Sequence, residues 1–432
     1  MEFYNVPGIS IAKVSKNKLE WSKAYGTANT RTGKKVDTST LFQAGSISKP
    51  VTALGALKLV ENNKLDLDED VNKYLKSWKI PENKYTSKEK VSLRMLLTHT
   101  AGTNVSGFPG YKRRDSLPTT AMILNGKGDT PKLIVDTLPG SNWSYSGGGY
   151  TVIQQLIEDV SGLPFEEYMQ KEILAPLGME NSSFEQPLPE KTENFSAAYD
   201  LQGKIIDSLY HNYPEKAAAG LWTTPTDLAK YCMEIQKILS GKKYGVISKS
   251  MAGQMLTKHQ FSWGLGPRLQ GEKDSLIFAH GGKNAGFTNN LLAFANKGEA
   301  LIIMTNGDNG IRLFQEIQRS VSEVYNWNLD KPRIVRATEL KPEFLSKLEG
   351  TYKYSGQTPD EYLVKVVYTD GKLNVYDLQD NDSLVLTPLN TNNYVDVLKG
   401  DEIVFSNPEK ATISFKWNNS QDFFRIEKAK SK

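Results

Sequence analysis

Segments typical of β-strands lie at both ends of the first 330 residues and are missing between them. Residues 9–14 and 19–24 form the first pair, joined by the polar turn 15–18. Strand-like segments return only in residues 261–265, 275–279, 287–295 and 300–305. We expect these two groups to form one antiparallel sheet. Residues of about 66–250 would then be a helical insertion, with a cleft between insertion and sheet where a small molecule could bind.

Helices are predicted around this sheet. In "SKPVTALGALKLVENNKL", residues 48–65, apolar side chains recur at i, i+3, i+4 and i+7. The segments "VSLRMLLTHTAG" and "GYTVIQQLIEDVSG" each read as a helix closed by a glycine. Residues 311–327 read as a long amphipathic helix. The fold class is therefore α+β, an antiparallel sheet flanked by helices.

The last 90 residues have a different pattern. Residues 331–340, "KPRIVRATEL", read as a linker after a first domain of residues 1–330. From residue 341 to 432, seven or eight short β segments alternate with turns such as Asp370-Gly371. This density of strands predicts a small antiparallel barrel or sandwich.

Composition excludes several classes of protein. The chain is 39% hydrophobic and 24% charged with a net charge of +4, the balance of a soluble globular protein. The basic run at residues 111–114 has no broader basic face around it, so no nucleic-acid partner is expected. No apolar run approaches the length of a transmembrane helix. Cys232 is the only cysteine, which excludes an internal disulfide, and its helical pattern indicates a buried thiol.

The stretch "FQAGSISKP" places Ser46, Ser48 and Lys49 within four positions. Residues three apart share a helix face, so Lys49 can reach Ser46 but not Ser48. Pro50 is tolerated only in the first turn of a helix, which places Ser46 near the positive end of the helix dipole. Partial burial would help Lys49 lose its proton and act as a base. A serine cap followed by a solvated lysine is the alternative for this stretch taken alone.

Two other segments carry candidate residues. Tyr145 lies in "PGSNWSYSGGGY", a glycine-rich loop that could project a phenol into a cleft, where cations would favour its phenolate. His280 is expected to end an apolar strand in "FAHGGKNAGF", and the glycines after it indicate close approach of a backbone or ligand. Either residue could instead be structural.

No metal or cofactor site is expected. His99, in "LLTHTAG", reads as a buried histidine that braces a helix end, and the other histidines stand apart. The acidic run that begins at Asp66 lacks the glycine and glutamate of a calcium loop, so it reads as the start of a helix.

Ser-x-x-Lys, a tyrosine in a tight loop and His-Gly-Gly on a late strand occur in this order over residues 6–327. Together with "LRMLLTHTAG", "ILAPLGMENSSF" and "AAGLWTTPTDLAKY", they resemble the serine β-lactamase and penicillin-binding protein superfamily. The similar branch contains class C β-lactamases, D-alanyl-D-alanine carboxypeptidases, D-aminopeptidases and β-lactamase-like esterases. The C-terminal region resembles the lipocalin-like β-domain that some of these hydrolases carry.

The resemblance implies a role for each matching position. Ser46 would be the acylated nucleophile, Lys49 its proton acceptor, and Tyr145 a proton shuttle. His280 would occupy the position of the lysine in a Lys-Thr-Gly triplet. The backbone N–H groups of Ser46 and Lys283 would form the oxyanion hole.

The sequence also departs from the family pattern. Gly147 stands where many members carry an asparagine that binds the side-chain amide of a peptide or β-lactam. Gly281 replaces the hydroxyl residue of the triplet and is followed by Gly282, so both are candidate substrate-binding positions. The helix that usually precedes the first strand is missing from this sequence. Either it has been trimmed away, or the helix at 311–327 covers that face alone.

The resemblance predicts a serine hydrolase acting on an ester or a D-amino-acid peptide or amide, with weak β-lactamase activity. The alternative is a penicillin-binding protein that senses cell-wall peptide without turnover. Homo-oligomers through the C-terminal domain are a further expectation. The resemblance implies that the protein is exported to the periplasm or the extracellular space, as members of this family commonly are. The sequence opens almost directly into a strand without the pattern of a signal peptide, so a cytoplasmic location stays open.

Overall fold

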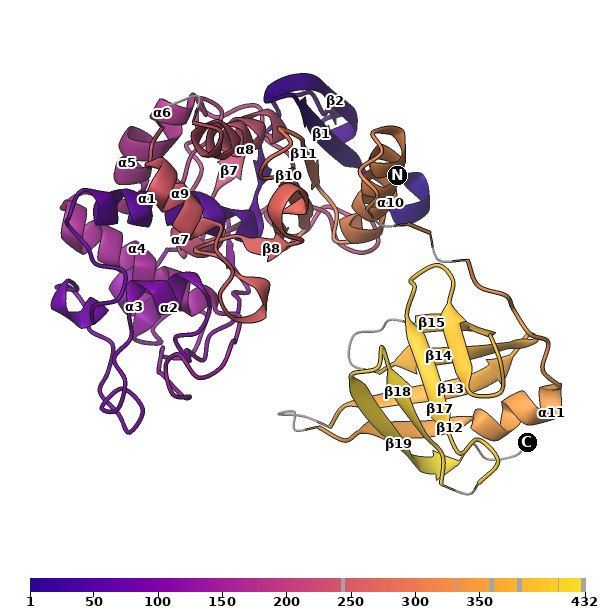
Figure 1. Ribbon diagram of the computed structural model, residues 1–432. Coiled ribbons are helices and arrows are strands. Elements are labelled where there is room, and N and C mark those ends of the chain that lie inside the picture. The colour runs from indigo at the N-terminus through magenta and orange to yellow at the C-terminus, as the bar shows by residue number, and fades with distance from the viewer. Residues whose placement is uncertain are drawn as a thin grey trace. The chain divides into compact units, whose positions relative to one another are not determined.

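The chain forms two compact units, Met1–Trp327 and Asn328–Lys432, each with its own hydrophobic core (Figure 1). The computed structural model describes residues 1–241, 245–329, 331–332, 334–356, 361–378, 383–410 and 412–428. Parts of the expected insertion, linker and barrel therefore lie outside the described residues, namely 242–244, 330, 333, 357–360, 379–382, 411 and 429–432.

The first unit is built on a seven-stranded antiparallel sheet that joins the beginning and end of the unit, as predicted. Its order is β3-β2-β1-β11-β10-β9-β8, and β1 is hydrogen-bonded to both β2 and β11. Because β1 pairs with β11 from Ile9↔Thr305 to Val14↔Ala300, the two ends of the unit are fixed to each other. The strands are β1 Gly8–Ser15, β2 Lys18–Asn29, β3 Lys34–Lys35, β8 Arg268–Gln270, β9 Ile277–Asn284, β10 Phe287–Phe294 and β11 Ala300–Thr305.

Helices cover both faces of this sheet (Figure 1). Successive side chains on a strand point to opposite faces. On β10, Leu291 and Ala293 belong to the main core, which also contains α8 (Pro225–Leu239), while Asn290 donates a hydrogen bond to Gln318 of α10 (Gly310–Val324). The α8 and α10 helices therefore lie on opposite faces.

The segment between β2 and β8 consists of helices joined by loops and turns, and it also contains two short strand pairs. The strand β4 (Phe42–Gln43) pairs with β7 (Trp222–Thr223), and β5 (Tyr111–Lys112) pairs with β6 (His211–Asn212). The β4–β7 pair fixes the segment that leads into the first long helix. The helices are α1 Ser48–Glu61, α2 Leu93–Leu97, α3 Thr120–Leu124, α4 Gly147–Ser161, α5 Phe165–Met169, α6 Ala175–Leu177, α7 Lys216–Ala219 and α9 Lys249–Met255.

Some local predictions were wrong. The segment 261–265 is not a strand, because Phe261 has a φ of 48°, is 72% exposed and packs its ring against Trp143. The edge strand β8 was missed, since it is short and mostly polar. The helix α4 ends at Gly162 in the left-handed conformation as expected, whereas α2 ends at Thr98, before the left-handed His99.

The second unit is a closed barrel of eight antiparallel strands (Figure 1). Its core is rich in aromatic side chains, including Tyr352, Phe405 and Phe415, as expected for a barrel of this size whose interior is filled by side chains. At the predicted hairpin turn, Asp370 and Gly371 both have positive φ. The strands are β12 Gly350–Tyr354, β13 Leu363–Thr369, β14 Lys372–Asp377, β15 Ser383–Pro388, β16 Asn393–Asp396, β17 Glu402–Ser406, β18 Ser414–Trp417 and β19 Gln421–Lys428, and the short helix α11 Pro342–Leu345 precedes them.

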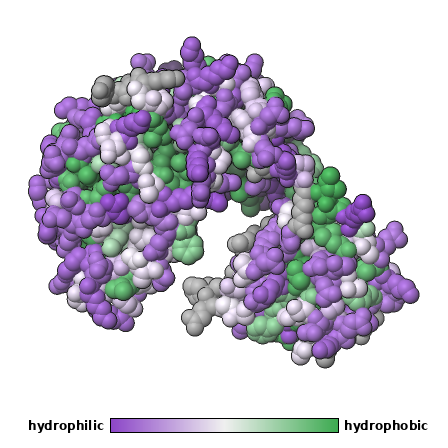
Figure 2. Space-filling view, viewed as in Figure 1, coloured by the Kyte–Doolittle hydropathy of each residue, from purple (hydrophilic) through white to green (hydrophobic). Residues whose placement is uncertain are grey.

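The visible surface is mainly hydrophilic, interspersed with smaller hydrophobic patches (Figure 2). Among the described residues, no helix has both the length and the apolar character needed to cross a membrane.

Candidate active site

Ser46 lies in a 3-10 turn, Gly45–Ile47, immediately before α1. Ala44, just before this turn, donates its N–H to Leu221 O at 2.8 Å, which fixes the entry to the turn. The first N–H groups of a helical segment have no partner within it, so the N–H of Ser46 points out of the turn. The positive end of the α1 dipole also lies here. The surroundings of Ser46 therefore favour negative charge.

Lys49 is one turn further along and 2% exposed. Its Nζ lies 3.0 Å from Ser46 Oγ and donates to Ala218 O at 2.9 Å. Burial lowers the pKa of the Lys49 ammonium to about 7. Near neutral pH a large fraction of Lys49 is therefore uncharged and can accept a proton from Ser46.

Ser48 faces elsewhere, as the spacing predicted. Its hydroxyl donates to Gly45 O at 2.6 Å and accepts the N–H of Leu221 at 3.0 Å. Ser48 thus joins the turn to the segment before β7 and leaves Ser46 as the serine beside the lysine.

Tyr145 is the other side chain next to Ser46, and its phenol is hydrogen-bonded to Ser46. Lys49 Nζ lies 4.9 Å from the centroid of the Tyr145 ring. Burial raises the pKa of the Tyr145 phenol, although the Ser46 hydrogen bond opposes that shift. The expectation of a phenolate was therefore wrong, since the buried phenol keeps its proton at neutral pH.

His280 lies within β9 and does not end it, because the strand continues to Asn284. Its Nδ1–H donates to Gly281 O at 2.6 Å, which leaves Nε2 as an acceptor. Nε2 is buried and has no hydrogen-bond partner among the described residues. Burial, aided by the charge of Lys49, lowers the pKa of His280 to about 3. The imidazole is neutral at physiological pH, so it does not supply the positive charge of the family lysine.

Two glycines bring the backbone of β9 against the Ser46 turn. A Cβ at Gly282 would lie 1.9 Å from Ala44 O, and one at Gly45, whose φ is 55°, would lie 2.7 Å from Lys283 N. Only glycine permits this approach. It brings the backbone of Lys283 against the turn that contains Ser46, the two residues expected to supply the oxyanion hole.

Gly281 and Gly147 differ in their surroundings. A Cβ at Gly281 would have only Asn289 O within 4 Å, at 3.9 Å, so the strand is open there. A Cβ at Gly147 would lie 2.6 Å from the Phe108 ring and 2.9 Å from Ser106 O. The space beside Gly147, the position matched to the asparagine of the family pattern, is therefore closed by the loop that contains Phe108.

Ser46, Tyr145, His280, Gly281, Gly282 and Lys283 all line one cavity of about 420 Å³. The sequence did not reveal its other walls, which include Trp263, Arg268, Ile311 and Phe314. These residues come from β8, α10 and the turn before β8. No motif marks them, and only the packing of α10 and the edge strand brings them to the cavity.

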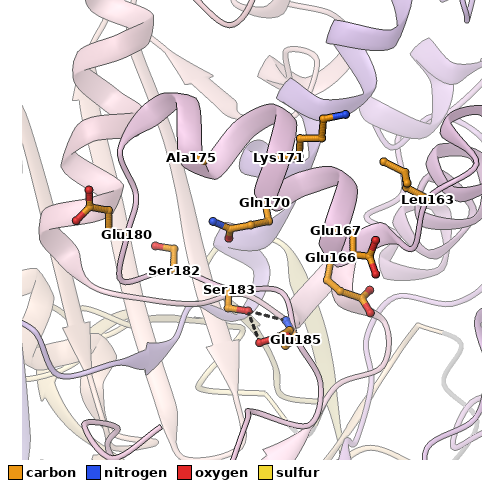
Figure 3. A pocket seen from close by; sticks show the side chains of 10 residues that line it. All are labelled: Leu163, Glu166, Glu167, Gln170, Lys171, Ala175, Glu180, Ser182, Ser183 and Glu185. Carbon is orange, nitrogen blue, oxygen red and sulfur yellow. Dashed lines mark hydrogen bonds between the residues drawn. The ribbon is translucent and has the colours of Figure 1, made fainter. Parts of the chain in front are cut away.

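A second, larger cavity of about 590 Å³ lies between α5 and the segment 180–185 (Figure 3). Four of its ten lining residues are glutamates, and one of them, Glu166, is paired with Lys216 at 2.6 Å. Ser183 accepts the N–H of Glu185 at 3.0 Å. None of the predicted site residues lines this cavity, so we place the candidate active site in the smaller one.

A family model described as Beta-lactamase matches residues 1–326. The chain belongs to this Beta-lactamase family. Among curated relatives, the "Teichoic acid D-alanine hydrolase" of Staphylococcus aureus is 28% identical over 259 residues, 58% of each chain. "Protein flp" of S. aureus strain MRSA252 is 28% identical over 230 residues, 52% of this chain and 44% of that protein. The chain thus spans about half the length of the curated relatives it matches.

Solved structures extend the likeness in fold over the whole chain. The octameric penicillin-binding protein homologue from Pyrococcus abyssi has a TM-score of 0.67 at 22% identity, covering 98% of this chain and 97% of that chain. The D-amino acid amidase from Ochrobactrum anthropi SV3 has a TM-score of 0.59 at 20% identity, covering 74% and 94%. Each of these structures has the same fold as the part of this chain that it covers.

Proposed function

We propose that the protein is a serine hydrolase that works through an acyl-enzyme on an ester or a D-amino-acid amide or peptide. The observation that carries the proposal is the 3.0 Å contact between Ser46 Oγ and the buried Lys49 Nζ. A nucleophile activated by an adjacent base is the arrangement that covalent hydrolases require.

Each step follows from the positions of these groups. Ser46 Oγ attacks the substrate carbonyl and gives its proton to neutral Lys49. The oxyanion accepts hydrogen bonds from the N–H groups of Ser46 and Lys283, and losing one such donor costs on the order of 10²–10³ in rate. As the bond between the carbonyl carbon and the leaving group breaks, Tyr145 donates its proton to the leaving group. Lys49 then passes to Tyr145 the proton that it took from Ser46. Water then attacks the acyl-enzyme carbonyl and gives its proton to Tyr145 and Lys49. These residues return a proton to Ser46 Oγ as its bond to the acyl group breaks.

The geometry favours esters and small amides over β-lactams. The asparagine that binds a β-lactam side chain has no counterpart at Gly147, and Phe108 and Ser106 occupy the space beside it. Two similar proteins are named for related substrates, a D-alanine hydrolase and a D-amino acid amidase. We therefore expect a D-aminoacyl ester or amide to be cleaved faster than nitrocefin.

Arg268 would recognise an anionic group on such a substrate. It lines the cavity, and within the described part of the chain its guanidinium makes no ion pair or side-chain hydrogen bond. A guanidinium binds carboxylate or phosphate in a bidentate manner. Arg268→Gln should lower kcat/KM about 10-fold for a D-Ala-D-Ala peptide with a free carboxylate and leave its amidated counterpart within 2-fold. Equal losses for both peptides would exclude this role.

The proposal is tested with one preparation and a panel of p-nitrophenyl acetate, D-amino-acid amides, D-Ala-D-Ala peptides and nitrocefin. Ser46→Ala should abolish hydrolysis, and Ser48→Ala should retain it if the turn survives. Turnover that persists in Ser46→Ala would contradict the mechanism.

The alternative is a penicillin-binding sensor without turnover, favoured by the two glycines at substrate positions, Gly147 and Gly281. A penicillin adduct on Ser46 that never clears, with no turnover of any ester or D-peptide, would support it.

The family resemblance supports a proposal for location and assembly. We infer an exported protein, periplasmic or extracellular, and homo-oligomers formed through the C-terminal barrel. Light scattering of the full chain would measure its oligomeric state.

A further inference from the structure

His99 contacts the backbone on both sides of Tyr145. The N–H of Ser144 donates to His99 O at 2.8 Å, and the N–H of Ser146 donates to His99 Nδ1 at 3.1 Å. The imidazole also lies against the Tyr145 ring, with a centroid distance of 4.4 Å and an interplanar angle of 35°. One residue thus holds the backbone N–H of the residue before Tyr145 and of the residue after it, and packs against the face of its ring.

The backbone of His99 is strained. Its φ is 60°, a region that residues with a Cβ rarely adopt, and the side chain is 1% exposed. Such strain persists only where surrounding contacts determine it, and it often marks functional sites. Here the left-handed turn directs both the carbonyl and the ring of His99 to the segment 144–146.

The hydrogen bonds also determine the tautomer. Because Nδ1 accepts the Ser146 N–H, the neutral ring carries its proton on Nε2, which has no hydrogen-bond partner among the described residues. The Trp263 ring lies 4.8 Å away at 86°, the edge-to-face arrangement that suits an N–H directed at an aromatic face. Burial, together with the charge of Lys49, holds the pKa of His99 well below 6.5, which keeps this tautomer across the neutral range.

We propose that His99 is the positioning residue of this site. It holds the Tyr145 phenol against Ser46 and supports Trp263 in the cavity wall. The inference rests on the proposed function, because it acts through the role given to Tyr145. A misplacement of about 1 Å of a reacting group can cost about 10²-fold in rate, so His99 would matter without touching substrate.

A matched pair of variants tests the hydrogen bond that the His99 side chain accepts from the Ser146 N–H. His99→Gly and His99→Asn both tolerate the left-handed backbone. Asparagine carries an oxygen at the δ position, where it can accept the Ser146 N–H. With p-nitrophenyl acetate, His99→Gly should lower kcat about 10²-fold with little change in KM, and His99→Asn should recover about 10-fold of that loss.

The decisive measurement repeats both substitutions in a Tyr145→Phe background. If His99 acts through the phenol, neither should lower kcat further there, because coupled groups are not additive. Equal losses in the two backgrounds, or no recovery with asparagine, would overturn the inference. If His99→Gly does not fold, His99→Asn is compared in the wild-type and Tyr145→Phe backgrounds. A loss of kcat that disappears in the Tyr145→Phe background depends on the phenol, and a loss that remains does not.

The rate of Ser46 labelling by a fluorophosphonate separates the two proposals. No labelling of the wild type would remove the proposed function. Labelling that His99 substitutions leave unchanged would remove only the positioning role.

Discussion

At the scale of single residues, burial distinguishes Lys49 from an ordinary lysine near the start of a helix. A solvated lysine in a Ser-x-x-Lys sequence has a pKa of about 10.4, so it is protonated at neutral pH. The same side chain in the core of the first unit has a pKa of about 7. Ala218 O and Ser46 Oγ then hold its nitrogen in place.

The pH dependence of the rate follows from this charge state. Lys49 must be uncharged to accept a proton, and its neutral fraction rises with pH. We therefore expect kcat/KM to rise through about pH 7 and then to level off. Lys49→Arg, which stays charged, should lose activity on the order of 10²–10⁴-fold.

The same profile tests the state of His280. With a pKa of about 3, its imidazole is already neutral, so no fall in rate should appear above neutrality. A fall near pH 7 that disappears in His280→Lys would show that a cationic imidazole is needed and would contradict the neutral assignment.

At this scale the sequence predicted part of the site. Helical spacing selected Ser46 over Ser48, and the order of three motifs drew attention to Tyr145 and His280. The charge states of Lys49, Tyr145 and His280 depend on burial that no local pattern shows. Arg268 and the paired contacts of His99 come from distant segments, so only the folded chain reveals them.

At the scale of elements, the approach of β9 to the Ser46 turn is the critical contact. Gly282 permits it and Gly281 does not take part, although the two are adjacent. The strand was predicted only as far as His280, whereas β9 continues through both glycines to Asn284. The segment 261–265 was mistaken for a strand, because Phe261 packs its ring against Trp143 and does not join a sheet.

Alanine at each glycine makes a matched test. Gly282→Ala places a methyl group 1.9 Å from Ala44 O, so β9 must move away and ester hydrolysis should fall at least about 10²-fold. Gly281→Ala meets no atom closer than 3.9 Å and should keep its thermal stability and most of its ester hydrolysis. Equal effects in steady-state kinetics would mean that the close approach is not required.

At the scale of the whole molecule, the two units have separate hydrophobic cores. The density of short strands predicted a small barrel or sandwich, and the return of strand segments after the helical region predicted the sheet. Oligomeric assembly was expected only from the family resemblance, since it depends on surfaces that no pattern in the chain marks.

Separate cores predict separate effects of core substitutions. Phe415 is buried against Tyr352, Phe405 and Phe423, so Phe415→Ala should cost the barrel about 3–5 kcal/mol. In calorimetry one transition should shift downward, while ester hydrolysis below that transition stays unchanged. The control Leu54→Ala, in the core of the first unit, should shift the other transition. A single transition that moves with both variants would show that the units unfold together.

The most direct test of the mechanism is the position of the covalent adduct. The protein is incubated with a fluorophosphonate or a slowly released ester, digested, and mapped by mass spectrometry. We predict one adduct, on Ser46, that is absent from Ser46→Ala and forms more slowly below pH 7 as Lys49 becomes protonated. An adduct on Ser48 or any other residue, or turnover without an adduct on Ser46, would contradict the mechanism.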